Sequence, residues 1–257
     1  MSKAKIFVTN DDGIDSPGIH ALVKALKEIA DVWVVAPDRQ QSAVGHAMTL
    51  SDPLRVHEFQ RDGEMFGHAV SGTPSDCVKL ALSSLLPEKP DLVVSGINHG
   101  RNTAVNILYS GTVSAATEAT LSGIKSLAVS HESHTYDVDM SVAAEYAKIL
   151  ALRLLDTEIP GGTLINMNVP DGRKEDIKGI KVVRHADTVW KDKYEMRTDP
   201  FNRDYYWFAG EYKIIHDDPD TDDRALHDKY VAVTPIHYDI TNYKFMNNIK
   251  HFEDIKH

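Results

Sequence analysis

The sequence contains one cysteine, Cys77, among 257 residues, so the chain can form neither an internal disulfide nor a metal site built from several thiolates. It also lacks any apolar run approaching the ~20 residues that cross a membrane. The first apolar run, residues 4–9, is far too short for the hydrophobic core of a signal peptide. We therefore expect a soluble, cytoplasmic protein in which Cys77, within the apolar stretch DCVKLAL, is a buried structural thiol.

Basic residues are scarce relative to acidic ones. Lys and Arg number 28 against 38 Asp and Glu, which gives a formal net charge of −10. Affinity for a phosphate polymer requires many basic contacts, so nucleic acid and anionic membrane are disfavoured as main partners. A small anionic substrate is compatible with this balance only if its site has a local positive charge. Hydrophobic residues make up 42% of the chain, which is ordinary for one large globular domain or for a domain with an appendage.

Strand and helix patterns alternate through the first two-thirds of the chain. Apolar, β-rich runs predict strands at 4–9, 31–37, 54–59, 64–70, 90–96 and 126–130, with a further strand at 231–241. Helical spacing of apolar residues predicts helices at 19–30, 75–86, 111–123 and 140–156. Near-continuous apolar strands between helices indicate an α/β protein with a doubly wound, mostly parallel, Rossmann-like sheet.

The last third has a different composition. Residues 190–212 hold eight of the chain's twenty aromatic residues, too many for a solvated linker. This segment predicts an extended, hairpin-like structure that needs a partner surface. The rings either pack against the body or a second subunit, or stack on the aromatic ring of a ligand.

Unusual polar residues follow three of the predicted strands. These are Asn10, Asp11, Asp12 and Gly13 after the first strand, Asp38 to Ser42 after the second, and Gly96 to Gly100 after the strand at 90–96. In an open α/β sheet, loops at the carboxyl ends of strands can converge on one ligand site. Two adjacent carboxylates repel each other unless solvent, a basic partner or a cation relieves the repulsion.

A divalent cation at this place is one way to relieve the repulsion between Asp11 and Asp12. Mg²⁺ and Mn²⁺ prefer oxygen ligands and keep positions open for water and phosphate. Asp11 and Asp12 would balance the charge of the cation, and the Ser42 hydroxyl and Asn98 amide oxygen would add neutral ligands. A bare Asp-Asp-Gly string is nevertheless typical of an ordinary turn. Its position directly after a first strand makes a metal site as well supported as a turn.

A second motif precedes the small-residue helix. Tyr109-Ser110-Gly111-Thr112 places a glycine between hydroxyl side chains at a helix N-terminus, where free N–H groups and the helix dipole suit phosphate. The same residues also suit a simple N-cap by Ser110 or Thr112, and the two interpretations are compatible. The motif is not a P-loop, because Gly-Lys-Ser/Thr is missing.

Five runs together resemble the SurE family, the survival-protein nucleotidases. They are VTNDDGIDSPGIHAL, APDRQQSAVGHAMTL, SGTPSDCVKLAL, SGINHGRNTAVNILYSGTVSAATEA and TDDRALHDKYVAVTPIHYDIT, within residues 4–241 and in the family's order. The resemblance implies hydrolysis of the phosphate monoester of nucleoside 5′-monophosphates and 3′-monophosphates. It also implies a divalent metal on Asp11, Asp12, Ser42 and Asn98, and phosphate contacts from Asn102, Ser110, Gly111 and Thr112. Asp11, Asp12 and Asn102 take the catalytic roles.

The resemblance further implies a nucleotidase core at 1–185 and a C-terminal oligomerisation arm at 186–257 with a returning strand, all within one structural domain. Dimers or tetramers would form through this arm. Some positions differ from the commoner family pattern. Ala43, Ala104 and the run at 227–230 stand where glycine is frequent, which affects loop shape and base preference but removes no ligand.

The mechanism that follows has the metal screening a substrate phosphate held for in-line attack. The attacker is a metal-activated water or an aspartate, and we favour water because both carboxylates are needed as ligands. His46 and His99 are candidates for protonating the leaving oxygen, although chance placement among thirteen histidines is the favoured explanation of both. The acidic run at 217–223 is interpreted as a solvated loop rather than a second metal site. Arg39 either pairs with a neighbour or touches phosphate.

Other functions stay open at this point. A non-catalytic nucleotide-binding or sensing protein would keep the same pocket, and a phosphatase acting on short polyphosphate would keep the same metal. A Rossmann-type dehydrogenase is disfavoured, because the glycine fingerprint after the first strand is absent. A haloacid-dehalogenase-type phosphatase would have Asp-x-Asp rather than adjacent aspartates.

Overall fold

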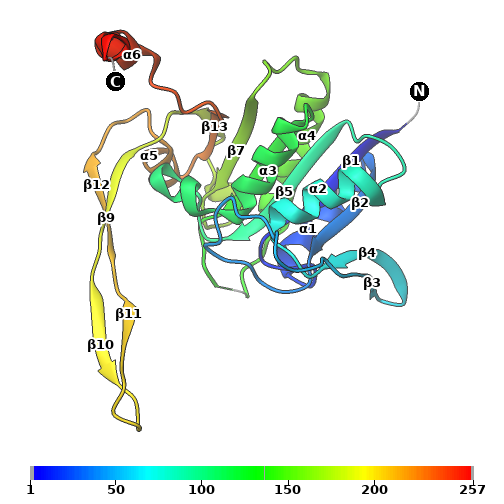
Figure 1. Ribbon diagram of the computed structural model, residues 1–257. Helices are drawn as coiled ribbons and strands as arrows, with labels where there is room; N and C mark the ends of the chain where they lie inside the picture. The colour runs from blue at the N-terminus through cyan, green and yellow to red at the C-terminus, as the bar shows by residue number, and fades with distance from the viewer. Residues whose placement is uncertain (1–2, 136, 256–257) are drawn as a thin grey trace.

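The structure is a computed structural model that describes residues 3–135 and 137–255. Nine strands form its central sheet: β1 (Ala4–Thr9), β2 (Ala30–Pro37), β3 (Val56–Arg61), β4 (Glu64–Val70), β5 (Leu92–His99), β6 (Lys125–His131), β7 (Thr163–Val169), β8 (Ile180–Val182) and β13 (Val231–His237). Their order is β3-β4-β2-β1-β5-β6-β7-β13-β8. The helices that cover the sheet are α1 (Pro17–Leu26), α2 (Pro74–Leu80), α3 (Gly111–Leu121) and α4 (Ser141–Asp156) (Figure 1). The predicted doubly wound, mostly parallel α/β fold is confirmed.

The strand order places a ligand crevice beside β1. β1 pairs in parallel with β2 on one side and with β5 on the other. The chain therefore leaves β1 for one half of the sheet and later returns to build the other half. Only the pairs of β3 with β4 and of β13 with β7 are antiparallel within this sheet. The reversal of strand order around β1 opens a crevice at the carboxyl ends of β1 and β5.

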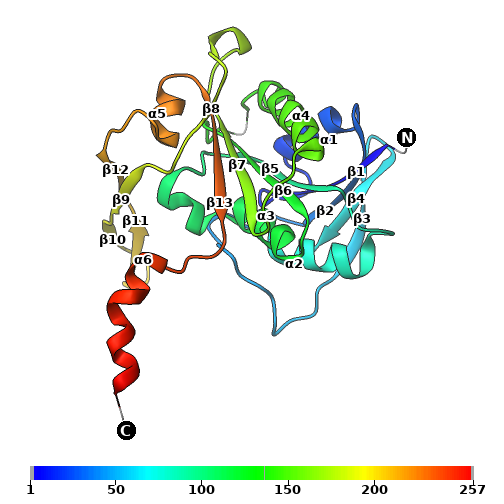
Figure 2. The ribbon, with the colours of Figure 1, turned by 90° about the horizontal axis from the view of Figure 1, so that it is seen from above.

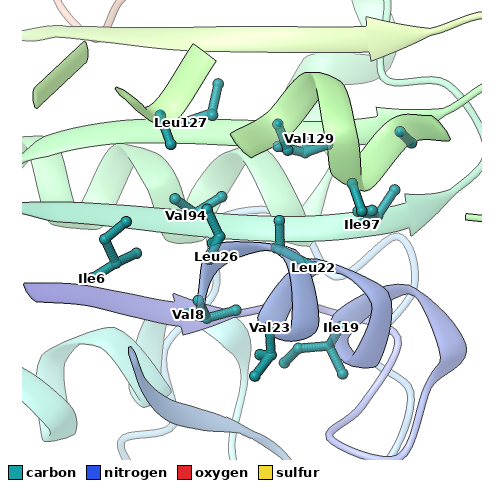
Figure 3. Close-up of a cluster of buried hydrophobic side chains, with 14 of the residues drawn as sticks. Ile6, Val8, Ile19, Leu22, Val23, Leu26, Val94, Ile97, Leu127 and Val129 are labelled. Carbon is teal, nitrogen blue, oxygen red and sulfur yellow. The ribbon is translucent and has the colours of Figure 1, made fainter. Parts of the chain in front are cut away.

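Both faces of the sheet are buried, and alternation along β1 shows how. Ile6 and Val8 point to the face covered by α1 and α4, where they pack with Leu22 and Leu26 (Figure 3). Phe7 points to the opposite face and packs with residues of α2 and α3, including Cys77. Cys77 is buried, as predicted from its apolar neighbours. The two cores hold the strand ends, and hence the loops that follow them, in fixed positions.

A long hairpin projects from this body. It consists of β9 (Asp187–Lys191), β10 (Tyr194–Thr198), β11 (Asp204–Phe208) and β12 (Glu211–His216), with β9 paired to β12 and β10 to β11, all antiparallel. Figure 1 shows the hairpin reaching away from the sheet. The extended structure predicted for residues 190–212 is confirmed.

The chain after the hairpin rejoins the body and then leaves it again. Helix α5 (Asp222–His227) leads into β13, and α6 (Tyr243–Met246) with the 3₁₀ segment Asn247–Asp254 ends the chain away from the sheet (Figure 2). None of the helices in residues 3–135 and 137–255 is long and apolar enough to cross a membrane.

Several element boundaries differ from the prediction. The helix expected at 19–30 ends at Leu26, and the one expected at 75–86 is α2 followed by a π-helical turn, Ala81–Leu85. The strand expected at 231–241 ends at His237. The strand expected at 90–96 continues to His99, because pairing with β6 resumes at Asn98 after an irregularity. Strands β7 and β8 and helices α5 and α6 were not predicted, since none has a long periodic pattern.

Truncating Phe7 tests the core beneath the crevice. Phe7 is fully buried, and we expect Phe7→Ala to lower the free energy of unfolding by about 3–5 kcal/mol, measured by denaturant titration. Phe201, in the turn between β10 and β11, is 78% exposed and provides the matched control. Phe201→Ala should change stability by less than about 0.5 kcal/mol. Equal effects of the two substitutions would contradict this description of the core.

Candidate active site

Three loops meet at the carboxyl ends of β1, β2 and β5. The backbone N–H of Gln41, after β2, donates to the carbonyl oxygen of Asp11 at 2.7 Å. The backbone N–H of His99, at the end of β5, donates to Asp12 Oδ2 at 3.0 Å. Within the first loop, Asn10 Nδ2 donates to the Gly13 carbonyl at 2.9 Å and closes the turn. The convergence predicted from the strand ends is therefore present in the structure.

A cavity of about 690 Å³ opens at this junction. Five of the residues singled out in the sequence line it, namely Asp11, Ser42, Asn98, Asn102 and Ser110. The other three lie directly behind its wall: Asp12 bonds to His99, Thr112 bonds to Asp11, and Gly111 follows Ser110. The structure thus brings all eight predicted residues to one place.

Asp11 is buried and carries an energetically costly charge. It is 4% exposed, and one of its oxygens accepts a hydrogen bond from the Thr112 hydroxyl. Burial, followed by the negative charge of Asp12, raises the pKa of Asp11 to about 7. A cation beside Asp11 would favour the ionised form and remove this penalty.

Asp12 is fixed by His99. Its Oδ2 accepts from both the backbone N–H and the ring Nδ1 of His99, each at 3.0 Å. No lysine or arginine in the described part of the chain lies within ion-pair distance of Asp11 or Asp12. Two adjacent buried acids without a basic partner are the arrangement that a bound cation stabilises.

Ser42 and Asn98 can complete an oxygen donor set. Asn98 Nδ2 donates to the Gly100 carbonyl at 2.7 Å, which leaves its amide oxygen as the atom available to a ligand. Ser42 is exposed on the cavity rim, where its hydroxyl accepts from Gln40 at 2.7 Å. Among the described residues no three His, Cys, Asp or Glu side chains gather as a metal cluster. Two carboxylates with two neutral oxygens fit a hard divalent cation that keeps open positions.

The N-terminus of α3 faces the same two acids. Ser110 is its N-cap, and the Ser110 hydroxyl accepts from the Val113 N–H at 3.2 Å. The N-cap interpretation of this motif is therefore confirmed. A Cβ placed on Gly111 would lie 2.8 Å from Asp11 Cβ, so only glycine allows the helix to approach the carboxylate this closely. The first-turn N–H groups of α3 are consequently held at the cavity wall, where they suit an anion.

Asn102 is held by polar residues that sequence reasoning missed. Its backbone N–H donates to Asn168 Oδ1 at 2.7 Å, and its carbonyl accepts from Asn166 Nδ2 at 2.8 Å. Its side-chain Nδ2 donates to the Ser130 hydroxyl at 2.9 Å, which leaves one amide N–H free for the cavity. Asn166 and Asn168 belong to β7, a strand that was not predicted, so no signal in the sequence connected them to Asn102.

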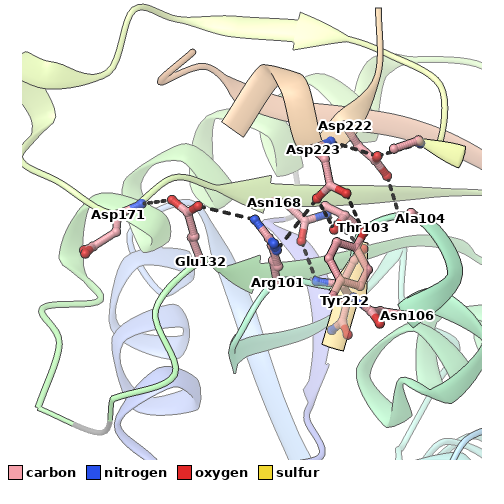
Figure 4. Close-up of polar contacts among 12 residues, drawn as sticks. Arg101, Thr103, Ala104, Asn106, Glu132, Asn168, Asp171, Tyr212, Asp222 and Asp223 are labelled. Carbon is pink, nitrogen blue, oxygen red and sulfur yellow. Dashed lines mark hydrogen bonds and ion pairs between the residues drawn. The ribbon is translucent and has the colours of Figure 1, made fainter. Parts of the chain in front are cut away.

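The acidic run at 217–223 was predicted as a solvated loop, and this is wrong for its last two members. Asp222 is fully buried and Asp223 is 3% exposed, at the start of α5. Asp222 accepts backbone N–H groups from Ala104 and Ala186, both at 2.8 Å, and Asp223 accepts from the Thr103 hydroxyl at 2.7 Å (Figure 4). Buried carboxylates satisfied in this way hold a loop in position. The two acids therefore fix the segment that carries Asn102.

We expect Asp222→Asn to disturb this segment. Burial raises the pKa of Asp222, and both of its oxygens accept N–H groups, so an amide would turn an NH₂ group towards a backbone donor. The variant should lose about tenfold in catalytic efficiency and melt at lower temperature. Asp218, which is half-exposed and pairs with Arg184, is the control, and Asp218→Asn should behave as the wild type. A fully active Asp222→Asn would show that the loop is held in another way.

The two candidate histidines lie in different places. His99 lines the cavity beside Asp12, whereas His46 bonds to Glu118 at 2.9 Å and does not line the cavity. Two basic side chains that were not predicted, Arg101 and His134, do line it. Arg39 is not among the described residues that line the cavity. The local positive charge required of an anion site therefore includes Arg101.

Comparison with known proteins agrees with this geometry. A family model described as "Survival protein SurE" matches residues 6–192. A protein of Syntrophobacter fumaroxidans named 5′-nucleotidase SurE is 47% identical over 246 residues, covering 95% of this chain and 98% of its own. A protein of the same name from Flavobacterium psychrophilum is 44% identical over 243 residues, which cover 94% of this chain and 94% of that protein. The crystal structure of a SurE protein from Aquifex aeolicus superposes with a TM-score of 0.85 at 42% identity, covering 97% of this chain and all of that one.

Proposed function

Because the chain belongs to the survival protein SurE family, we propose that it is a metal-dependent nucleotidase, a hydrolase that releases phosphate from nucleoside 5′-monophosphates and 3′-monophosphates. Relatives named 5′-nucleotidase SurE match nearly the whole chain and are themselves covered to 94% and 98%. The observation that carries it is the cavity in which Asp11, Ser42, Asn98 and the N-terminus of α3 meet.

The metal part of the proposal assigns a divalent cation, Mg²⁺ or Mn²⁺, to Asp11, Asp12, Ser42 and Asn98. The buried acid pair without a lysine or arginine partner supports it, as does the all-oxygen donor set. When bound, the cation supplies positive charge that neutralises a substrate phosphate and polarises its P–O bond. The same charge explains how an acidic protein accepts an anionic substrate.

The phosphate part assigns Asn102, Ser110, Gly111 and Thr112 to the transferred group. The free amide N–H of Asn102 and the first-turn N–H groups of α3 would donate to phosphate oxygens and so orient the group for in-line attack. Water is our proposed attacker, because Asp11 is bonded by Thr112 and Asp12 by His99. A phosphoryl-aspartate trapped at Asp11 would contradict the choice of water.

The experiment is a substrate panel with and without chelator. The purified protein should release phosphate from AMP, GMP and 3′-AMP in the presence of Mn²⁺ or Mg²⁺, and EDTA should abolish release. Release from tripolyphosphate alone would favour a polyphosphatase. Tight AMP binding with no release under any metal would favour a nucleotide-sensing protein instead.

We further propose that the chain forms a cytoplasmic homodimer or homotetramer through the arm at residues 186–257. Large apolar side chains along the end of the chain support an oligomer, since Ile240 is 91% exposed and Tyr243, Phe245 and Phe252 are all more than half exposed. Light scattering on the purified protein measures the number of copies directly.

A further inference from the structure

The cavity extends well beyond the residues assigned to metal and phosphate. Four aromatic side chains of the hairpin form its outer wall, Trp190 from β9, Tyr194 from β10, Phe208 from β11 and Tyr212 from β12. We propose that these four residues, called the aromatic wall, together with Arg101 form a nucleobase subsite that holds the base of the substrate while its phosphate lies at Asn102. The inference rests on the proposed nucleotidase function and names the part of the substrate that the hairpin recognises.

The rings of the aromatic wall form one continuous cluster. Trp190 lies 5.5 Å from Tyr212 and 5.9 Å from Phe208 between ring centroids, and Tyr194 lies 5.5 Å from Phe208. Contacts between these rings are tilted or edge-to-face, with interplanar angles of 56° to 64°, so no pair of these rings is stacked in parallel. Tyr194 is 62% exposed and Phe208 52% exposed. Exposed rings on a cavity wall suit a planar aromatic ligand, since every base has a face that stacks.

Hydrogen bonds fix the aromatic wall to the part of the cavity that carries Asn102. Trp190 Nε1 donates to Asn106 Oδ1 at 2.9 Å, only four residues after Asn102. The Tyr212 hydroxyl donates to Asp223, which also accepts from Thr103 (Figure 4). Both ends of a nucleotide would therefore contact groups fixed to the segment 102–106. This coupling gives the preorganisation that a binding site needs.

Arg101 adds a polar group at the edge of the same wall. Its guanidinium lies over the Tyr212 ring at 5.3 Å and forms ion pairs at 3.7 Å with Glu132 and Asp223 (Figure 4). None of its N–H groups makes a hydrogen bond within the described residues, so the donors are available to a ligand. Acceptor atoms on the edge of a base, such as N7 and O6 of guanine, match that planar fork.

The test compares a nucleotide with its base-free counterpart. In Trp190→Ala we expect kcat/KM for AMP and GMP to fall about tenfold or more, mainly through KM. Hydrolysis of ribose 5-phosphate should be unchanged, because this substrate has no base that could contact Trp190. Arg101→Gln should lower kcat/KM for GMP by a larger factor than kcat/KM for ribose 5-phosphate, and Trp190→Phe should recover most of the AMP activity.

Trp207→Ala is the matched control. Trp207 pairs with Glu195 on β10, one residue before Phe208, and so projects from the opposite face of the hairpin, 58% exposed and outside the cavity. It should behave as the wild type with both substrates. An equal loss on AMP and ribose 5-phosphate in Trp190→Ala, or no loss on either, would overturn the subsite. Should the wild type hydrolyse neither substrate, the nucleotidase proposal fails by itself. Calorimetry with adenosine then decides the subsite, because binding must weaken in Trp190→Ala and persist in Trp207→Ala.

Discussion

Asp12→Asn is expected to reduce phosphate release from AMP by at least about 10²–10³-fold. The substitution keeps the size of the side chain, and an amide oxygen can still accept from the His99 N–H at about the present 3.0 Å. What it removes is one of the two negative charges that balance a divalent cation. Mn²⁺ binding, measured by calorimetry, should weaken together with activity, and the wild type in chelator should show the same loss.

The control for charge removal is Asp15→Asn. Asp15 lies three residues further along the same loop, with its side chain 81% exposed and only a 3.8 Å contact to Arg61. Its variant should keep wild-type activity and wild-type Mn²⁺ affinity. If Asp12→Asn retained activity within tenfold of the wild type, the acid pair would have no role in holding a cation.

Gly111→Ala is expected to cost about 10²-fold in kcat, although it adds only a methyl group. The new Cβ would lie 2.8 Å from Asp11 Cβ, 3.0 Å from Asp11 Oδ2 and 3.1 Å from a ring carbon of Pro74. Either the N-terminus of α3 or Asp11 must shift. A displacement of about 1 Å between a reacting group and its partners is enough for a loss of this size. Phosphate release and the melting temperature, measured on the same sample, give both consequences of the shift.

Local propensity makes the opposite prediction for this variant. Alanine is favoured over glycine in a helix by up to about 1 kcal/mol, so α3 considered alone would gain stability. Gly161 provides the comparison, because a Cβ there meets nothing within 4 Å. Gly161→Ala should be neutral in activity. A fully active and more stable Gly111→Ala would show that the contact with Asp11 is not tight.

The fold was predictable where the sequence has a strong local period. Ile6 and Val8 lie on one face of β1 and Phe7 on the other, and a strand with apolar residues on both faces is typical of a sheet covered on both sides. The element boundaries that were predicted wrongly have a common cause. β5 runs on to His99 through a glycine-containing stretch because β6 supplies partners for Asn98 and His99. The sequence around Asn98 and His99 does not indicate that β6 will pair with them.

The site residues, too, were predictable only where a local pattern indicates them. Asp11, Asp12, Ser42 and Asn98 were identified because they directly follow strands, and strand ends in a parallel sheet share an edge. Asp222 was misassigned because its run of acids has the composition of a solvated loop. Its partners, the N–H groups of Ala104 and Ala186, are 118 and 36 residues away in sequence.

The sequence by itself determined the alternation of strands and helices, the chemistry of the three loops and the glycine before α3, because each depends on neighbouring residues. Only the tertiary structure decided that Asp222 and Asp223 are buried against the Asn102 segment and that the aromatic wall faces the catalytic cavity. Burial and the orientation of a ring depend on surfaces contributed by distant segments. Those surfaces exist only after the sheet has assembled, and no local pattern encodes which segment will supply them.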